Sequence, residues 1–229
     1  MAVDSFAGKL AVVTGGGSGM GRELVRQLAA QGCSVAACDL NADTVAVTAA
    51  TAWAAAPPGV AVTGHACDVS DEAQVQRFRD ELLERHASDH VDLVFANAGI
   101  AGGASFVKDS REEWERTFAI NWWGVYFCAR TFLPLLIASG DGVLVNTGSV
   151  AGFWATAGAG APITAYSTSE FAIKGFSGAW RILVGEEAKM LDEQVRVNPE
   201  AAFDYENYAE MYGPLIAQAQ AEASGTPEP

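Results

Sequence analysis

Short apolar runs rich in β-branched residues alternate with longer amphipathic segments along the first two thirds of the chain. Runs of this kind predict buried β-strands, and the longer segments between them predict helices. Strands that alternate with helices form βαβ units around a parallel sheet. The predicted fold class is therefore α/β, with strands expected over residues 10–13, 34–39, 60–65, 91–96 and 143–146.

Glycine and capping residues mark where the predicted helices begin and end. The first helix covers residues 19–30 and is followed by Gly32, which suits a left-handed C-terminal position. The helix after Ser110 has Glu113 in place for a capping box and is expected to run to about Ile137. Two more helices are expected to open at capping residues, Asn41 and Ser70.

The composition fits a globular α/β protein. Hydrophobic residues make up 50% of the 229 residues, charged residues make up 18%, and there are 24 glycines. A disordered tail, a coiled coil and a collagen-like repeat each need very different proportions. Lys and Arg number 14 against 28 Asp and Glu, a net charge of -14 that would repel a phosphate backbone. Nucleic-acid binding is not expected.

The cysteines and the first apolar run predict a cytoplasmic protein. Cys33, Cys38, Cys67 and Cys128 lack CxxC spacing, and only three histidines accompany them. No metal site and no disulfide framework is therefore expected, and the thiols should be reduced. The run over residues 10–13 is far shorter than a signal-peptide core or a membrane span, so no membrane contact is expected.

A glycine-rich stretch, residues 14–21 (TGGGSGMG), follows the first predicted strand and opens the first predicted helix. Glycines there allow a tight turn and let backbone N–H groups and the helix N-terminus approach a pyrophosphate. This context predicts a dinucleotide site on a Rossmann-type, doubly wound parallel sheet flanked by helices. A strand-to-helix turn that binds nothing is the alternative interpretation.

Asp39 ends the second predicted strand, where a carboxylate accepts hydrogen bonds from the ribose hydroxyls of adenosine. Such a carboxylate would repel the 2′-phosphate of NADP. Neither Ser18 nor Leu40 supplies a compensating cation, so NAD is the expected cofactor. The alternative is that Asp39 only helps to start the following helix.

From about Gly8 to Ser177 the chain resembles the short-chain dehydrogenase/reductase family. Residues 14–21 match the family's TGxxxGxG loop, and residues 97–99 match its NAG motif. The remaining matches are single positions: Asp68 and Val69 after the third strand, Asn121 at the active-site asparagine, Ser149 at the end of the fifth strand, and Tyr166 at the start of the YxxxK segment.

The resemblance implies hydride transfer between a nicotinamide and a secondary alcohol or ketone. Tyr166 would be the acid/base, Ser149 would hydrogen-bond the substrate oxygen, and Asn121 would hold a water in a proton relay. A phenol can serve if its pKa falls from about 10 toward neutrality. A homodimer or homotetramer is also implied. The implied cofactor-binding residues are Gly15, Gly17, Ser18, Gly19, Met20, Gly21, Asp39, Leu40, Asp68, Val69, Asn97, Ala98, Gly99 and Tyr166.

One catalytic position departs from the family motif. The motif has lysine four residues after the tyrosine, but this chain has Glu170. Position i+4 lies one turn along the same helix face, where a lysine favours phenolate and reaches the nicotinamide ribose. A carboxylate there disfavours phenolate, so we expect impaired turnover. Lys174 lies roughly 12 Å from Tyr166 along the helix axis and is better placed to pair with Glu170.

The segment after Ser177 also departs from the family, because residues 178–229 leave little room for a sixth strand, a substrate lid and a last strand. In one interpretation residues 178–187 form a last strand and the turn into a terminal helix. In the other, the helix continues through Leu191 and residues 194–199 form a degenerate sixth strand. The first is favoured, and either leaves the C-terminal part truncated.

Aromatic residues cluster in sequence near Asn121 and Ser149: Trp122, Trp123, Phe153 and Trp154. They could line an apolar pocket for a hydrophobic substrate, but packing in the core or at a subunit interface is favoured.

The sequence therefore favours an NAD-dependent oxidoreductase. A nucleotide-binding protein without turnover is the alternative, and a structural oligomer without ligand is disfavoured by the intact glycine loop. One NAD-binding domain is expected over residues 1–223, with residues 224–229 as a disordered tail.

Overall fold

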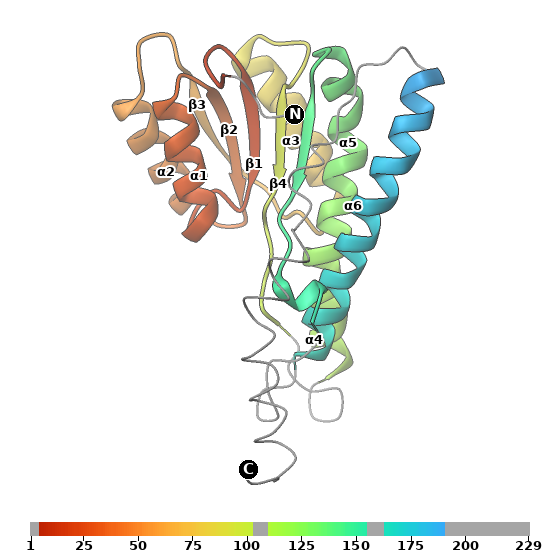
Figure 1. The fold of residues 1–229 in the computed structure, drawn as a ribbon. Coiled ribbons are helices and arrows are strands. Elements are labelled where there is room, and N and C mark those ends of the chain that lie inside the picture. Colours follow the sequence, from red (N-terminus) through yellow and green to blue (C-terminus); the bar gives the residue numbers. More distant parts are fainter. Residues whose placement is uncertain (1–4, 103–109, 155–162, 191–229) are drawn as a thin grey trace, which may run out of the picture.

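Five parallel strands form one sheet in the computed structural model, which describes residues 5–102, 110–154 and 163–190. The strand order is β3-β2-β1-β4-β5 (Figure 1). The order reverses between β1 and β4, so the predicted doubly wound α/β sheet is confirmed. The strands are β1 (Leu10–Thr14), β2 (Ser34–Asp39), β3 (Val62–Ala66), β4 (Leu93–Ala96) and β5 (Val143–Asn146).

Two of these strands have the predicted bounds, and three differ by one or two residues. β2 and β5 begin and end as expected, whereas β1 extends to Thr14. β3 and β4 begin later than predicted, at Val62 and Leu93, because the apolar residues before them pack in the core without joining the ladder.

Helices cover both faces of the sheet (Figure 1). One face carries α1 (Gly19–Ala30) and α2 (Ala42–Ala55). The other carries α3 (Glu72–His86), α5 (Gly124–Ala138) and α6 (Thr164–Met190). Gly32, just past α1, has a φ of 84°, as its predicted left-handed position requires.

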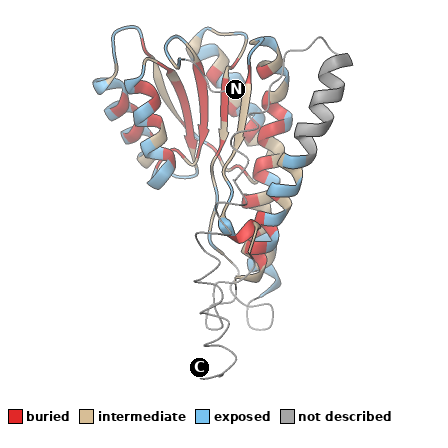
Figure 2. Ribbon diagram, in the orientation of Figure 1, coloured by how far each residue is buried: buried red, intermediate tan, exposed pale blue. Residues whose placement is uncertain are grey.

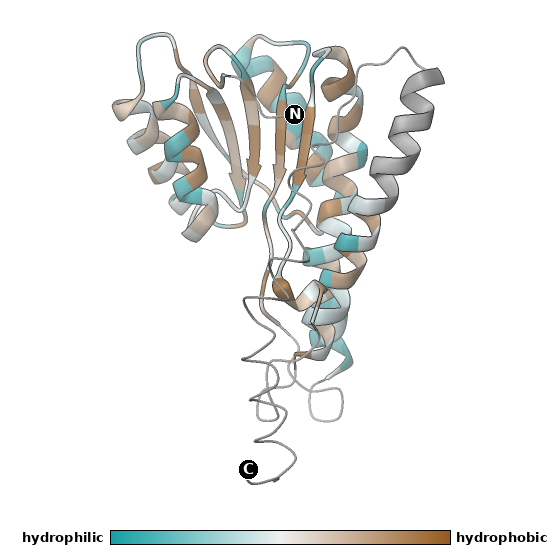
Figure 3. Cartoon of the chain, in the orientation of Figure 1, coloured by the Kyte–Doolittle hydropathy of each residue, from teal (hydrophilic) through white to brown (hydrophobic). Residues whose placement is uncertain are grey.

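Alternation along the strands divides the side chains between two cores. In β1, Ala11 and Val13 face α1 and α2, whereas Leu10 and Val12 face α3 and α5. Every residue of β1 is buried, and the red of buried residues marks the middle of the sheet in Figure 2. The strands also carry the brown of hydrophobic residues in Figure 3. Burial on both faces explains why their sequences read as continuous apolar runs.

Two helices are capped as predicted. Asn41 Oδ1 accepts the backbone N–H groups of Asp43 and Thr44, each at 3.1 Å. Ser110 Oγ accepts the N–H of Glu113 at 3.3 Å, at the start of α4 (Arg111–Phe118). Both side chains satisfy N–H groups that a helix leaves without an internal partner.

The predicted cap of the third helix is wrong by one residue. Asp71 caps α3, because its carboxylate accepts the N–H of Ala73 at 2.9 Å. Ser70 instead donates its hydroxyl to Asp68 at 2.6 Å. A carboxylate at the positive end of the helix dipole competes well with a hydroxyl for this position.

The helix predicted from Ser110 to Ile137 is not one regular α-helix. Residues Ala119–Trp123 form a π-helical turn, η1, between α4 and α5. A π turn holds an extra residue and is frequent at functional sites. Asn121 lies buried in this turn. Apolar periodicity did not reveal the extra residue.

The favoured interpretation of residues 178–187 as a last strand is wrong. α6 continues through this segment to Met190, close to the Leu191 of the alternative interpretation. Ser177 Oγ donates to the carbonyl of Ile173 at 2.8 Å, in the i to i−4 pattern of a helix. The expected sixth strand at 194–199 and the tail at 224–229 lie outside the described residues.

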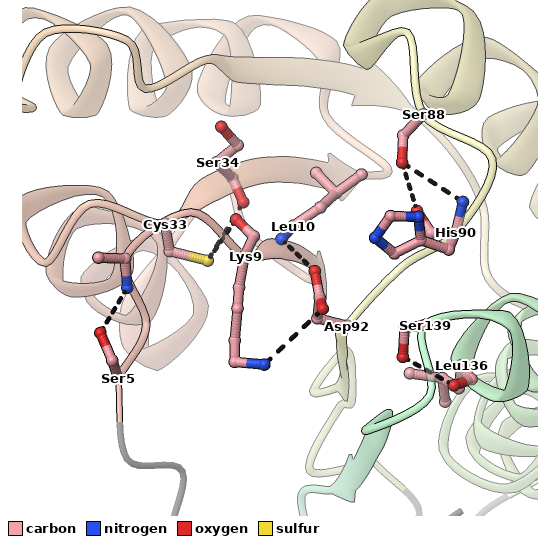
Figure 4. A network of polar contacts seen from close by, with 11 residues as sticks. Ser5, Lys9, Leu10, Cys33, Ser34, Ser88, His90, Asp92, Leu136 and Ser139 are labelled. Atoms are coloured by element: carbon pink, nitrogen blue, oxygen red, sulfur yellow. Dashed lines mark hydrogen bonds and ion pairs between the residues drawn. The ribbon is translucent and has the colours of Figure 1, made fainter. Parts of the chain in front are cut away.

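Polar contacts join the amino ends of β1 and β4 (Figure 4). The glycine loop follows the other end of β1. Asp92 accepts the backbone N–H of Leu10 at 2.7 Å, and its second oxygen lies 3.7 Å from Lys9 Nζ. The Cys33 thiol donates to the carbonyl of Lys9 at 3.3 Å. These contacts fix the strand ends that lie away from the candidate site.

Two negative findings apply to the part of the chain that the structure describes. None of its helices is both long and apolar enough to cross a membrane. Nor does it contain a group of three or more His, Cys, Asp or Glu side chains that could hold a metal ion. All four cysteines are free and buried.

Candidate functional site

The glycine loop, residues 15–21, folds tightly between β1 and α1. Gly15 has a φ of 68°, a left-handed conformation that glycine adopts without strain. A Cβ there would lie 2.9 Å from the Cα of Ala98, and a Cβ at Gly21 would overlap the carbonyl oxygen of Gly15. Ser18 makes no side-chain capping bond to α1. The N–H groups of the first turn are therefore available to an anion.

Asp39 lies at the carboxyl end of β2, beside the glycine loop. One carboxylate oxygen accepts the N–H of Gly17 at 2.9 Å, and the other accepts the N–H of Asn41 at 3.0 Å. Each oxygen keeps a lone pair that can accept a ribose hydroxyl. Asp39 does not cap α2, because Asn41 does so. Leu40 and Met20, both predicted to bind cofactor, are exposed.

Arg22 is a charged residue of the loop that sequence reasoning missed. Its guanidinium donates to the carbonyl of Gly17 and, through Nε, to Thr48 Oγ1 at 3.2 Å. Gly17 also donates its N–H to Asp39. Its carbonyl therefore bonds a cation, Arg22, and its N–H bonds an anion, Asp39. The motif gives no signal for Arg22, because its main partner is a backbone carbonyl.

The turn after β4 is bonded to the end of β1. Thr14 Oγ1 accepts the N–H groups of Asn97 and Ala98 at 2.9 and 3.0 Å, and Asn97 Nδ2 donates to the Thr14 carbonyl at 3.0 Å. Thr147, just after β5, donates to Asn97 Oδ1 at 3.3 Å. One set of polar contacts thus connects the carboxyl ends of β1, β4 and β5.

Asp68 and Val69 follow β3 and differ in their surroundings. Asp68 Oδ1 accepts both the N–H and the hydroxyl of Ser70, at 2.9 and 2.6 Å. Val69 is buried against α5, since a Cβ at Gly124 would lie 2.9 Å from its Cγ2. The Val69 side chain therefore belongs to the hydrophobic core.

Asn121 connects three segments from within the π turn. Its Oδ1 accepts the N–H of Ile100 at 2.8 Å, and its Nδ2 donates to the Ile100 carbonyl at 2.9 Å. The same Nδ2 lies 3.3 Å from Ser169 Oγ on α6. A Cβ at Gly99 would lie 3.5 Å from Asn121 Oδ1, so the turn after β4 packs directly on this amide.

Ser149 and Tyr166 approach the same end of the sheet from different elements. Ser149 precedes the short 3-10 helix η2 (Val150–Gly152), and its Oγ accepts the N–H of Ala151 at 3.1 Å. Tyr166 is half-buried in the first turn of α6, and its carbonyl accepts the hydroxyl of Ser169 at 2.7 Å.

Glu170 is buried one turn after Tyr166. Only 6% of the residue is exposed, and its Oε2 has no hydrogen-bond partner. Burial raises the pKa of the carboxyl, and a hydrogen bond from the Ser149 backbone opposes that rise. The backbone of Glu170 packs against η2, since a Cβ at Gly152 would lie 2.8 Å from its carbonyl oxygen. Gly148 lies close to Oε2.

The expected pairing of Lys174 with Glu170 is wrong. Lys174 Nζ lies 4.0 Å from the centre of the Phe153 ring, a cation–π geometry. Phe153 directly follows η2, and Lys174 is exposed, whereas Glu170 is buried. The carboxyl therefore has no cation beside it among the described side chains.

Two of the aromatic residues expected near the site, Trp122 and Trp123, belong to a cluster on η1, α5 and α6. Phe153 and Trp154 instead follow η2. The Trp122 and Phe176 rings are 5.4 Å apart and nearly perpendicular, and Trp123 stacks on Phe127 at 5.8 Å. Trp123 is 45% exposed. This arrangement fits packing between helices, with an exposed edge, better than the lining of a closed pocket.

A bound dinucleotide fits these residues along the carboxyl ends of the strands. The glycine loop leaves a cradle where a Cβ would collide, and Asp39 has free acceptor capacity on one side of it. Asn97, Ser149 and Glu170 lie on the other side, after β4, after β5 and on α6. In an open parallel sheet, ligands bind along this edge, at the point where the strand order reverses.

Known proteins resemble this chain over most of its length. A model of the short chain dehydrogenase family matches residues 9–198. SadH of Mycobacterium tuberculosis, which is named as an oxidoreductase, is 36% identical over 179 residues, which are 78% of this chain and 62% of SadH. The 2-dehydro-3-deoxy-L-rhamnonate dehydrogenase (NAD(+)) of Sphingomonas is 35% identical over 75% of this chain and 64% of its own. The chain thus spans less than two thirds of either relative.

Solved structures agree. A short chain dehydrogenase/reductase from Burkholderia phymatum, in complex with NAD, has a TM-score of 0.74 and 31% identity over 85% of this chain and 65% of its own. A metagenomic short-chain oxidoreductase in complex with NADP has a TM-score of 0.70 and 27% identity over 84% and 80% of the two chains. The family model matches 190 residues of this chain, and SadH is 36% identical to it over 78% of this chain's length. This chain therefore belongs to the short-chain dehydrogenase family.

Proposed function

We propose that this protein is an NAD-dependent oxidoreductase that interconverts a secondary alcohol and a ketone. The observation that carries the proposal is the Asp39 carboxylate, hydrogen-bonded at 2.9 Å to the N–H of Gly17 in the glycine loop. That contact supports the proposal, because a dinucleotide needs a ribose acceptor beside the loop that would hold its pyrophosphate. The names of relatives support the reaction class, since they include a rhamnonate dehydrogenase and a meso-2,3-butanediol dehydrogenase.

The chain's own residues would move the proton and orient the substrate. When bound, the nicotinamide supplies the hydride acceptor or donor. Tyr166 would exchange a proton with the substrate oxygen, and Ser149 would hydrogen-bond that oxygen. Asn121 would hold a water in the relay. Because both side-chain groups of Asn121 already bond Ile100, we propose that the water would bind its backbone carbonyl.

The preference for NAD over NADP rests on charge. The Asp39 carboxylate would face the 2′-phosphate of NADP at short range and repel it. The positive charge of Arg22 could offset this repulsion, but its guanidinium already bonds the Gly17 carbonyl and Thr48. Similar proteins have been crystallised with either cofactor, so the balance between Asp39 and Arg22 decides the choice here.

A protein that binds NAD(H) without efficient turnover is the second candidate. Glu170 favours it, because a carboxylate near Tyr166 raises the energy of the phenolate. It also lacks the donor groups with which a lysine positions the nicotinamide ribose. In either case we propose one NAD-binding domain, a homodimer or homotetramer, and a reducing cytoplasmic setting that suits the four free cysteines.

Two measurements test the function. Fluorescence titration with NADH should show saturable binding, which a protein without a nucleotide site would lack. A panel of secondary alcohols and ketones, assayed from about pH 7 to about pH 10, then separates slow turnover from none. Activity that survives in Tyr166→Phe would contradict the role of the phenol, and Thr168→Ala, an exposed neighbour on the same helix, is the control.

A further inference from the structure

We propose that Glu170 makes the cofactor site discriminate between oxidised and reduced cofactor, in favour of NAD⁺. The nicotinamide ring of NAD⁺ carries a positive charge, whereas that of NADH is neutral. A carboxylate in the wall of the site attracts the first and is indifferent to the second. This inference rests on the proposed cofactor site, and it assigns to Glu170 a role that a lysine at the same position could not have.

The burial of Glu170 is the first step. A carboxyl group this deeply buried normally has each oxygen hydrogen-bonded, because an unpaired polar atom costs about 1 to 3 kcal/mol. Here Oε2 has no partner, and the Ser149 backbone is the group that bonds the carboxyl. The side chain is therefore poised for a charge or a donor that arrives from outside the chain.

The position of Glu170 along the ligand path is the second step. Asp39 follows β2 and the glycine loop follows β1, so the adenosine half of a dinucleotide occupies that part of the sheet edge. The other half must lie beyond the loop, toward the carboxyl ends of β4 and β5. The Glu170 carboxyl lies beside Gly148, two residues after β5, because a Cβ at Gly148 would lie 3.8 Å from its Oε2. Its charge therefore acts on the nicotinamide half.

The surroundings of the carboxyl are the third step, because another ion could cancel the effect. On α6 the nearest titratable groups are Tyr166 and Lys174, and the Lys174 ammonium lies over the Phe153 ring. The turn after β5 offers the neutral Ser149, and η1 offers the neutral Asn121. α4 also packs on α6, but its charged residues, Arg111, Glu112, Glu113, Glu115 and Arg116, are exposed.

The binding of NAD⁺ should be coupled to the loss of a proton from Glu170. Burial raises the pKa of Glu170, so its neutral carboxyl persists to higher pH than that of an exposed glutamate. A cationic ring favours the ionised form and lowers that pKa, so NAD⁺ binding releases a proton. The affinity for NAD⁺ should then rise with pH across the Glu170 titration. The affinity for NADH should not follow the same course.

Calorimetric titration of the whole 229-residue chain tests this without any turnover. NAD⁺ and NADH are each titrated from about pH 5 to about pH 8, in two buffers of different ionisation enthalpy, so that released protons are counted. We expect proton release with NAD⁺ alone, and an NAD⁺ to NADH affinity ratio that rises about tenfold over this range if the pKa falls by one unit.

Glu170→Gln keeps the shape of the side chain and removes its charge. The variant should show a ratio that no longer depends on pH, with no proton release. Glu84→Gln, an exposed acid on α3, is the matched control and should behave as the unaltered protein. If Glu170→Gln fails to fold, the proton count on the unaltered protein still decides the matter.

The outcomes separate this inference from the proposed function. Binding of both nucleotides with equal pH dependence and no proton release overturns the role of Glu170 and leaves the cofactor site standing. Failure of both nucleotides to bind overturns the proposed function and the inference with it.

Discussion

Asp39 offers the most direct test of cofactor choice at the scale of one residue. Replacing it with alanine removes the ribose acceptor and the repulsion of a 2′-phosphate, so the preference for NADH over NADPH should narrow by roughly 1 kcal/mol or more. Dissociation constants for both nucleotides measure the change. Asp43→Ala is the matched control, because this acid lies on the first turn of α2 and does not contact the glycine loop.

Tighter binding of NADPH by the unaltered protein would contradict the assignment. It would indicate that Arg22 leaves the Gly17 carbonyl and binds the phosphate. In that event Arg22→Ala should abolish the preference for NADPH, whereas Asp39→Ala should strengthen it.

Glu170→Lys is the second test at this scale. The substitution restores a cation one turn from Tyr166, which stabilises phenolate, and a donor for the nicotinamide ribose. We expect any measurable rate of NAD-dependent oxidation to rise roughly tenfold or more near neutral pH. Rates from about pH 7 to about pH 10 should be compared for both forms. Glu170 is buried, so a lysine ammonium in its place would be desolvated, and thermal stability should fall in the same variant.

A fast unaltered protein, with no gain from the lysine, would show that some other group activates Tyr166. Lys174→Ala serves as the control for general charge effects, because its ammonium lies on the Phe153 ring and away from the carboxyl.

At the scale of elements, the edge strand β3 is joined to α3 by two imidazoles, His65, which is buried, and His86, which is half-buried. His65 Nδ1 lies 3.0 Å from Glu81 Oε2, and its Nε2 lies 2.9 Å from Thr63 Oγ1. The same hydroxyl lies 2.8 Å from His86 Nε2. Burial lowers the pKa of His65 and, with repulsion from its histidine neighbour, lowers that of His86 to about 4.

Both imidazoles are therefore neutral in the folded protein at neutral pH, and the unfolded chain binds protons more readily. The free energy of unfolding should be highest above about pH 6.5 and fall as the pH drops toward about 4, where His86 is protonated in the folded state as well. Urea denaturation at several pH values measures this. His86→Gln should flatten the decline, and His90→Gln, in the connection between α3 and β4, should not. An equal effect of both variants would contradict the assignment to the β3–α3 junction.

Local chemistry made several elements predictable. Asn41 and Ser110 cap helices because a side-chain oxygen just before a helix can accept an N–H group of the first turn. The end of α6 was mistaken because Gly178 and an apolar run imitate a strand after a turn, although the i to i−4 bonds continue. The π turn at Asn121 was missed because one additional residue hardly alters an apolar pattern.

The candidate site was predictable in its parts and less so in its contacts. The glycine loop, Asp39 and the NAG turn follow from strand ends that must meet at one edge of a parallel sheet. Motif spacing carries no information on Arg22, whose partner is a backbone carbonyl, or on Lys174, which prefers an aromatic ring over a carboxylate. Spacing placed Glu170 one turn from Tyr166, but only packing shows that its carboxyl points inward.

For the whole molecule, the aromatic cluster on η1 and α5 predicts self-association. Trp123 is 45% exposed yet packs on Phe127, which suits the rim of a helix-to-helix interface. We expect a dimer or tetramer in sedimentation at micromolar concentration, and Trp123→Glu should shift it toward the 24.0 kDa monomer. Trp53→Glu on α2, which is 62% exposed, should leave the assembly unchanged. A monomer for the unaltered protein would rule out this interface.

The π turn makes the number of residues between α4 and α5 important, whatever their identity. Each residue of a helix adds about 100° of rotation, so the extra residue sets the phase between α4 and α5. Deleting Ile120 would leave Asn121 and every proposed catalytic group in the chain, yet α4 would turn by about that angle relative to α5. Thr117, now buried against Gly102, would rotate away. The number of residues between α4 and α5 therefore matters to the site as much as which residues they are.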